Sequence, residues 1–251
     1  MSEVSEVSVQ FLGSGDAFGS GGRFQTCIYV QSAATHFLID CGASSLIAMR
    51  RFGVDPSLVD VILVTHLHGD HFGGLPFFIV DARMVSKRTR PLVVAGPPGL
   101  KARLPEAMEA FFPGSSDKQH GFPLQLVELA AETETPIPPL VVTAYGVVHS
   151  SGAPAYALRV ACEDKIIAYS GDTKWTDALI EAAAGADLFV CEAYFFEKQI
   201  RNHLSYQDLL RHRAELGCRR LVLTHMSEDM LQRLPQVDSE CAEDGKRIVL
   251  A

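Results

Sequence analysis

Three histidines and an aspartate lie within six consecutive positions of the chain, in the stretch THLHGDH. In an extended segment, His66 and His68 project to the same side because side chains alternate along it. Gly69 then permits a turn that directs Asp70 and His71 away from the first pair, toward a second position nearby. Imidazole nitrogens and carboxylate oxygens are ligands for Zn²⁺, Mn²⁺ or Fe²⁺. The stretch therefore predicts half of a site for two divalent metal ions, and a histidine-rich surface turn is the weaker interpretation.

Four ligands shared between two ions leave each ion incompletely coordinated, and residues at three distant strand ends can supply the rest. Apolar runs that predict strands lead into His149, Asp172 and His225. In layered α/β folds, functional groups collect where strands end. The carboxylate of Asp172 can bridge two ions, and Gly171 lets the backbone come close to them. Seven ligands around two ions about 3.5–4 Å apart would leave room for a bridging hydroxide, the nucleophile of two-metal hydrolysis.

Further charged residues surround these predicted ligands. Asp40 ends an apolar run and is expected either to ligate a metal or to orient a ligand loop. Glu192 and His203 are predicted to act together, the carboxylate orienting an imidazole that protonates a leaving alkoxide. The alternative is that these two residues are unrelated. Asp16 and Arg23, in the stretch FLGSGDAFGSGGR, are either a buried ion pair in a glycine-rich turn or a clamp on the substrate.

The elements that must position these residues alternate between apolar strands and helical segments. Strands are expected at 7–13, 27–31, 35–40, 59–65, 91–96, 124–129, 139–148, 155–161, 165–171, 186–193, 219–224 and 247–251. Helices are expected at 44–53, 99–112, 174–185, 205–217 and 227–234. Residues 81–91, 112–123 and 132–139 are expected to be loops or connectors. This order predicts an α/β fold with buried sheets, organised as a single domain over residues 1–251.

The composition limits the class of protein and its partners. The formal net charge of −8 is unlike the basic footprint of a protein that grips a long nucleic acid. A small phosphorylated substrate remains compatible, because bound dications supply local positive charge. The six cysteines form no CxxC pair, which favours free thiols in a reducing compartment. No apolar stretch approaches membrane-spanning length and the N-terminus has no basic signal region, so we expect a cytoplasmic protein without membrane association.

The motif THLHGDH resembles the HxHxDH signature of the metallo-β-lactamase superfamily, and the later motifs around His149, Asp172 and His225 follow in the same order. The resemblance covers most of the chain. It implies a four-layer αββα sandwich of two mixed sheets flanked by helices, with two metal ions at one edge. By this resemblance, the first ion is held by His66, His68 and His149, the second by Asp70, His71 and His225, and both by Asp172. Asp40 matches an aspartate that supports the metal loop.

The stretches FLGSGDAFGSGGR and CEAYFFEK…NHLSY are similar to the ribonuclease Z and small phosphodiesterase branch. In that branch, residues corresponding to Glu192 and His203 assist proton transfer. The tRNA-binding arm of the branch's tRNA-processing members has no counterpart here, since only a hairpin's length separates His149 from Asp172. The branch's HST motif at the later histidine also reads HLS, so tRNA is a poor candidate substrate. The resemblance is also compatible with a homodimer.

We therefore predict a hydrolase with two divalent ions, Zn or Mn before Fe, acting on a small phosphodiester or cyclic phosphate. Asp70, Glu192 and His203 are the predicted catalytic residues, Asp70 being also a ligand. Three alternatives stay open: hydrolysis of a carboxylic ester, lactone or thioester at the same metals, cleavage of RNA 3′ ends, and metal binding without catalysis.

Overall fold

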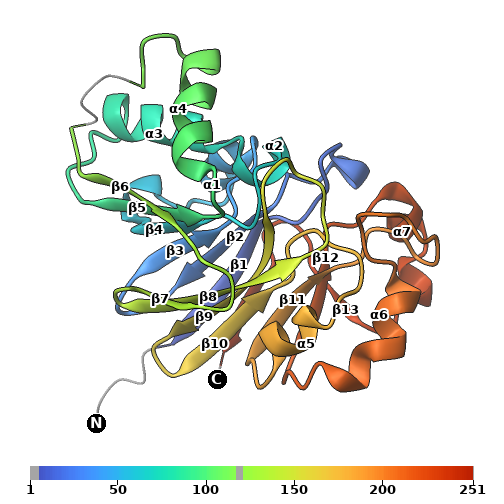
Figure 1. Cartoon of the computed structure of the whole chain (residues 1–251). Helices are drawn as coiled ribbons and strands as arrows, with labels where there is room; N and C mark the ends of the chain where they lie inside the picture. Colours follow the sequence, from blue (N-terminus) through green and yellow to red (C-terminus); the bar gives the residue numbers. More distant parts are fainter. Residues whose placement is uncertain (1–5, 117–120, 251) are drawn as a thin grey trace.

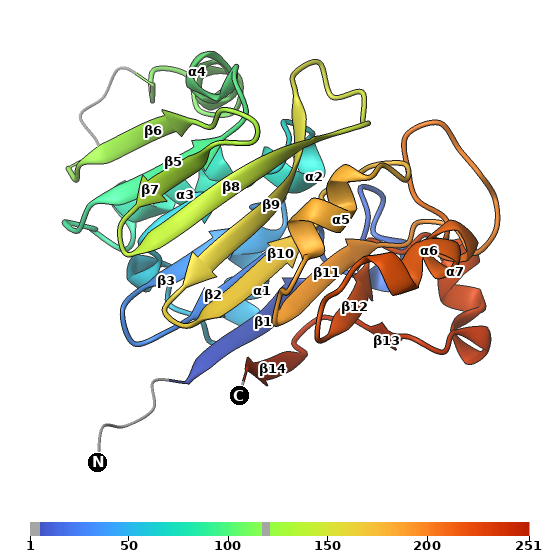
Figure 2. The same ribbon diagram turned by 60° about the horizontal axis from the view of Figure 1, so that its bottom comes forward.

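The computed structural model describes residues 6–116 and 121–250, and within them two seven-stranded sheets pack face to face (Figure 1). The strand order is β14-β1-β2-β3-β4-β5-β6 in the first sheet and β13-β12-β11-β10-β9-β8-β7 in the second. Each sheet contains both parallel and antiparallel neighbours. Helices cover the outer face of each sheet, as the turned view in Figure 2 shows. The predicted αββα sandwich is confirmed.

The strands of the first sheet are β1 (Val7–Gly13), β2 (Cys27–Gln31), β3 (His36–Ile39), β4 (Val61–Leu63), β5 (Leu92–Gly96), β6 (Leu124–Glu128) and β14 (Arg247–Leu250). Those of the second are β7 (Glu134–Ile137), β8 (Leu140–Val147), β9 (Ala155–Cys162), β10 (Lys165–Tyr169), β11 (Leu188–Glu192), β12 (Leu221–Thr224) and β13 (Glu240–Cys241). The helices are α1 (Ser45–Arg51), α2 (Gly69–Phe72), α3 (Leu75–Met84), α4 (Leu100–Phe111), α5 (Ala178–Ala183), α6 (Tyr206–His212) and α7 (Glu228–Gln232). Short 3₁₀ turns lie at Ser20–Gly22, Pro56–Leu58, Arg213–Glu215 and Leu234–Gln236.

Three apolar layers hold the four structural layers together. The central layer lies between the sheets and joins residues of both, for example Phe11 and Tyr169. Leu38 of β3 faces the opposite way from its neighbours and packs in the layer that contacts α1–α4. Phe189 of β11 lies in the layer beneath α5–α7. Strands buried on both faces need apolar residues at consecutive positions, which is why their sequences read as continuous apolar runs.

Three segments differ from the sequence-based prediction. Glu134–Ile137, expected to be a connector, forms edge strand β7, where proline is tolerated because part of the backbone needs no partner. The helix α3 at Leu75–Met84 was not predicted, and it extends into a segment expected to be a loop. Its residues are apolar on most sides because it is buried, so the sequence shows no helical stripe. The two-residue strand β13 is too short to give a pattern.

The chain directs the ends of several strands to one edge of the sandwich. In the first sheet β3, β4, β5 and β6 run parallel, and in the second β10, β11, β12 and β13 do so. β8 and β10 are both antiparallel to β9, so they point the same way. The segments that follow these strands therefore meet along one edge, where the predicted site residues lie. None of the helices in the described part of the chain combines the length and apolar character of a membrane span.

Candidate metal centre

The first group of potential ligands comprises His66, His68 and His149, whose nitrogens lie within 4.8 Å of one another. His66 follows β4, and His68 precedes α2 with an extended backbone, so both imidazoles face the same side, as predicted. The rings of His66 and His68 lie 4.9 Å apart. His149 arrives from the end of β8, with its Nε2 at 3.0 Å from His68 Nδ1. These three nitrogens could hold one ion.

The second group comprises Asp70, His71, Asp172 and His225, and its four ligand atoms also lie within 4.8 Å of one another. Asp70 and His71 stand on α2, which begins at Gly69, where a turn was expected. Nε2 of His71 lies 3.2 Å from Asp70 Oδ2 and 3.2 Å from Asp172 Oδ1. Nε2 of His225 lies 3.2 Å from Asp172 Oδ2. This set combines two carboxylates with two imidazoles.

The carboxylate of Asp172 faces both groups. Its Oδ2 lies 3.8 Å from His66 Nε2 and 3.9 Å from His149 Nε2, while its Oδ1 faces His71 of the other group. Gly171 has a φ of 58°, and a Cβ there would meet the carbonyl oxygen of Tyr156 at 2.6 Å. A glycine at this position lets the turn bring Asp172 between the two groups, where one carboxylate could contact two ions.

Partners behind the cluster fix the orientation of its imidazoles. Asp40 Oδ2 accepts from His71 Nδ1 at 2.6 Å, and its carboxylate also accepts from the backbone N–H and the hydroxyl of Thr65. Such a contact is the one expected of a carboxylate that orients a ligand, the second of the two roles predicted for Asp40. The Thr26 hydroxyl lies 3.2 Å from His225 Nδ1, and the backbone carbonyl of Asn202 lies 2.9 Å from His149 Nδ1. In each of these histidines, Nε2 is thereby left facing the cluster.

Two of these residues adopt backbone conformations that side chains rarely take. Asp40 has a φ of 61° and His225 a φ of 56°, in the left-handed region. Such a residue costs roughly 1–3 kcal/mol and persists only where its surroundings enforce it. The Asp40 side chain is held as described above, and the backbone N–H of His225 donates to the Ser14 carbonyl. Both strained residues lie at strand ends that face the cluster.

The buried charges and unpaired atoms of the cluster fit bound cations. Burial opposes protonation of His71, but Asp172, Asp70 and Asp40 outweigh it and hold its pKa well above the ordinary value. Burial holds the pKa of His66 well below its ordinary value, so its imidazole is neutral, the form that binds metals. His66 Nε2, His71 Nε2 and Asp172 Oδ1 are buried and make no hydrogen bond of good geometry, although the last two atoms lie 3.2 Å apart. Unpaired buried polar atoms are costly, and divalent ions would satisfy all three.

Glu192 and His203 form the predicted pair beside this cluster. Nδ1 of His203 lies 3.0 Å from Glu192 Oε2 and 3.9 Å from Asp172 Oδ2. Glu192 also accepts from the backbone N–H of Thr173. The His203 side chain is 19% exposed whereas that of Glu192 is fully buried, so only the imidazole can reach a substrate. Burial and the charge of Asp172 hold the pKa of Glu192 well above its ordinary value.

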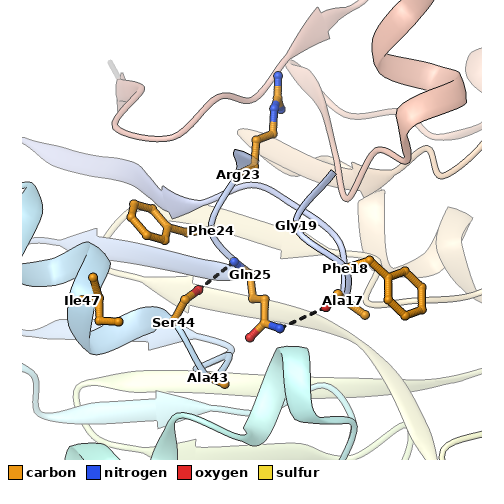
Figure 3. A pocket seen from close by; sticks show the side chains of 9 residues that line it. All are labelled: Ala17, Phe18, Gly19, Arg23, Phe24, Gln25, Ala43, Ser44 and Ile47. Atoms are coloured by element: carbon orange, nitrogen blue, oxygen red, sulfur yellow. Dashed lines mark hydrogen bonds between the residues drawn. The ribbon is translucent and has the colours of Figure 1, made fainter. Parts of the chain in front are cut away.

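Asp16 and Arg23 do not form the ion pair that was one interpretation of their motif. Asp16 is buried and accepts from the backbone N–H groups of Phe18 and Ser20 and from the Ser20 hydroxyl. Arg23 donates at 2.7 Å to the carbonyl of Ala242, more than two hundred residues away in the chain. In Figure 3 its guanidinium extends away from Gln25. The local motif could not reveal this long-range partner, and a substrate-clamp role for either residue stays a prediction.

The sequence analysis did not assign several residues that the structure places against the site. Thr65 and Thr26 hydrogen-bond the cluster as described, and the Tyr194 ring stacks on His203 with 4.5 Å between centroids. Burial, followed by the charge of Asp16, raises the pKa of Tyr194 to about 12, so its hydroxyl keeps its proton. Thr65 directly precedes His66, and Tyr194 follows Glu192 by two positions. The sequence could have suggested Thr65 and Tyr194 only through their nearness to residues already predicted at the site.

Comparison with known proteins places this geometry in a family. The family model described as "Anti-Pycsar protein Apyc1" matches residues 7–242. A curated ribonuclease Z from Ignicoccus hospitalis is 26% identical over 298 aligned positions, which cover 95% of this chain and 97% of that protein.

Solved structures agree on the fold. The metallo-β-lactamase fold protein YhfI from Bacillus subtilis superposes with a TM-score of 0.78 at 19% identity, covering 97% of this chain and 99% of YhfI. A diphosphatase of the PhnP family superposes with a TM-score of 0.74 at 19% identity, covering 96% of this chain and 97% of that one. The fold is therefore the metallo-β-lactamase fold. The chain belongs to the Apyc1 family and is a metal-dependent hydrolase with a cluster that fits a dinuclear metal site.

Proposed function

We propose that this chain is a phosphodiesterase that hydrolyses a small phosphodiester, with a cyclic nucleotide as the leading substrate. The observation that carries the proposal is the Glu192–His203 pair beside the shared carboxylate of Asp172. An alkoxide leaving group is a strong base and needs a proton donor, whereas a thiolate needs little help. Membership in the Apyc1 family favours a cyclic nucleotide within this class, and the PhnP-family likeness supports phosphoryl chemistry.

We assign the two groups of potential ligands to two ions. His66, His68 and His149 would hold the first and Asp70, His71 and His225 the second, with Asp172 contacting both. The nitrogen and oxygen donors contain no thiolate, which favours Zn or Mn and also accommodates Fe. When bound, such ions polarise a phosphoryl group and lower the pKa of a water molecule.

The protein's own groups then handle the proton of the leaving oxygen. Because Glu192 engages Nδ1 of His203, the free Nε2 is the atom that would deliver a proton. The fully buried Glu192 holds the other nitrogen of this imidazole in place. Asp40 holds Nδ1 of His71, which would leave Nε2 available to the second ion.

Several features support a small substrate. A hollow of about 400 Å³ is lined by Ala17, Phe18, Phe24, Gln25 and Ile47 among others (Figure 3). Its lining includes none of the potential metal ligands, although Gln25 directly precedes Thr26, which contacts His225. Between His149 and Asp172 the chain forms only a loop and the β9–β10 hairpin, which leaves no protruding arm there. The net charge of −8 also disfavours a long polyanion.

The test is turnover of cyclic mononucleotides and of bis(p-nitrophenyl) phosphate by protein loaded with Zn²⁺ or Mn²⁺. We expect hydrolysis of both, with His203→Ala losing about 10²–10⁴-fold on the cyclic nucleotide, the usual contribution of acid–base catalysis. Fully metallated protein that ignores every phosphodiester but hydrolyses a carboxylic ester, lactone or thioester would overturn the proposal.

A second candidate, an RNA 3′-end endonuclease, is supported by the ribonuclease Z relative. The two functions separate in one assay, in which a precursor tRNA with a 3′ trailer competes with a cyclic nucleotide. Cleavage of the trailer at low ionic strength without turnover of the cyclic nucleotide would favour the endonuclease.

A further inference from the structure

Tyr194 lies against two of the histidines at the site. Its ring stacks on that of His203, with centroids 4.5 Å apart and an interplanar angle of 25°. The same ring lies 5.8 Å from that of His225. His203 and His225 are themselves nearly parallel, with an interplanar angle of 12°. The three rings therefore form one aligned group beside the cluster.

The backbone of Tyr194 is bonded to both histidine-bearing loops. Its N–H donates at 2.9 Å to the carbonyl of Leu204, the residue after His203. Its carbonyl accepts from the backbone N–H of Ser227 at 3.0 Å and from the Ser227 hydroxyl at 2.5 Å. Ser227 follows His225 by two positions. Tyr194 is thus fixed relative to each histidine by main-chain bonds as well as by ring contact.

The far end of the Tyr194 side chain lies close to Asp16, whose charge adds to burial in raising the pKa of the phenol. Asp16 is fully buried, and three donors from Phe18 and Ser20 hold its carboxylate in place. Asp16 belongs to the loop after β1 in the first sheet, whereas Tyr194 follows β11 in the second. The phenol therefore spans the two sheets at the mouth of the site.

A single hydrogen bond does not define the plane of an imidazole, because the ring can turn about the axis of that bond. The side chain of His203 has one such bond, from Nδ1 to Glu192. A flat neighbour in stacking contact fixes the ring plane, and with it the direction of Nε2. His149, whose ring lies 5.1 Å away at 72°, meets His203 edge-on, and of the two stacked rings Tyr194 lies nearer, at 4.5 Å against 5.8 Å for His225.

We propose that Tyr194, with Asp16 beside it, is a positioning residue that holds the imidazole of His203 with Nε2 directed at the leaving oxygen of the substrate. The inference rests on the proposed phosphodiesterase function, in which His203 supplies the proton. It gives Asp16 a role in catalysis through Tyr194 rather than through substrate contact. Tyr194 makes no bond to the reacting atoms.

The test compares leaving groups in the metallated enzyme. The substrates are two thymidine 5′-phosphodiesters, one releasing p-nitrophenolate and the other releasing methoxide. Tyr194→Leu removes the ring, Tyr194→Phe keeps the ring and removes the hydroxyl, and Asp16→Asn removes the charge beside the phenol. Tyr145→Leu, in a partly buried position of β8 away from the histidine rings, is the matched control.

For Tyr194→Leu we expect kcat for the methyl ester to fall about 10–100-fold, as for removal of partners that orient a ligand. For the p-nitrophenyl ester, kcat should change less than about threefold, because a good leaving group needs little protonation. The KM of both esters should stay unchanged. Tyr194→Phe and Asp16→Asn should lose less kcat, again mainly on the methyl ester. The Tyr145→Leu control should lose no kcat on either ester. Should Tyr194→Leu fail to fold, Tyr194→Phe and Asp16→Asn still decide the matter. Equal losses on both esters, or no loss on the methyl ester, would overturn the inference.

Failure of the inference and failure of the proposed function give different results. If wild-type protein hydrolyses neither these esters, nor bis(p-nitrophenyl) phosphate, nor a cyclic nucleotide, the proposed function falls and the inference with it. If wild-type protein turns over both esters and His203→Ala shows the leaving-group selectivity while the Tyr194 variants do not, only the role of Tyr194 is refuted.

Discussion

Asp172 faces more of the surrounding histidines than any other single carboxylate at the site. Its two oxygens face His71, His225, His66 and His149 at 3.2–3.9 Å. Burial alone would raise its pKa, but the charges of His225 and His71 outweigh burial and hold the pKa well below its ordinary value. The carboxylate is therefore ionised when buried. A buried anion of this kind requires positive partners on more than one side.

We expect Asp172→Asn to reduce bound metal from two ions per chain to about one, because a neutral amide is a poor bridge. Turnover should fall by more than the roughly 10–100-fold that loss of an orienting partner costs. Elemental analysis and steady-state kinetics measure the two effects. Asp164→Asn is the matched control, since the Asp164 side chain is 73% exposed and pairs with Lys165. A variant that keeps two ions and full rate would contradict the bridging assignment.

At the scale of elements, the site depends on how strands end. β10 ends at Tyr169, and the chain must turn sharply to place Asp172 in the cluster. Gly171 makes that turn with a positive φ, in contact with the backbone of Tyr156 from β9. The geometry of one strand end therefore sets the position of the shared carboxylate.

Gly171→Ala should destabilise the protein and weaken metal binding. The left-handed backbone alone costs a non-glycine residue about 1–3 kcal/mol, and the contact with the Tyr156 carbonyl adds to it. Chemical denaturation gives the free energy of unfolding. Gly146→Ala, in β8, is the matched control, because a Cβ there meets nothing within 4 Å and its φ is not positive. Equal stability of the two variants would refute the role of Gly171.

At the scale of the whole molecule, the metal cluster joins the two sheets. His66, His68, Asp70 and His71 follow β4 of the first sheet, whereas His149, Asp172 and His225 follow strands of the second. After β13 of the second sheet, the chain returns to the first sheet, where β14 pairs with β1. The connection between β13 and β14 is therefore a second crossing of the chain between the two sheets. Bound ions would cross-link the same two layers close to this crossing, because Asp244 accepts from the backbone N–H of Ser14, whose carbonyl accepts from His225.

Removal of metal should therefore lower the Tm of the entire protein in one transition. Each ion bound at a hundredfold excess over its Kd contributes about 2.7 kcal/mol to folding. Scanning calorimetry before and after dialysis against EDTA measures the shift, and added Zn²⁺ or Mn²⁺ should reverse it. An unchanged Tm after verified loss of metal would show that the sheets do not depend on the cluster.

The packing of the whole molecule should also protect most of the cysteine thiols from chemical modification. Burial raises the pKa of Cys27 to about 12 and holds that of Cys41 well above its ordinary value. Cys162 and Cys191 are also buried, and Cys218 and Cys241 are half-buried. Because thiolates are the reactive form, we expect DTNB to label at most Cys218 and Cys241 quickly in the native protein. All six should react in guanidinium chloride, and rapid native labelling of six would contradict this packing.

Local sequence patterns predicted the class of fold and which residues would meet at the candidate site. Ligand types, their spacing in THLHGDH and their placement after apolar runs are local properties, which short-range patterns record. The two-faced apolar strands likewise indicated buried sheets. The structure brings the predicted ligands, Asp40 and the Glu192–His203 pair together at one edge.

Contacts between segments distant in the chain were decided only by the tertiary structure. Arg23 donates a hydrogen bond to the carbonyl of Ala242, and Asp16 lies close to Tyr194, although each partner lies far along the chain. The helix α3 left no helical stripe because burial on most sides removes the polar face that a periodic pattern needs. Local sequence patterns indicate which side chains of a strand or helix point into the protein. The residue that such a side chain contacts on that face depends on how the two sheets pack. That packing also brings together the groups that orient His203.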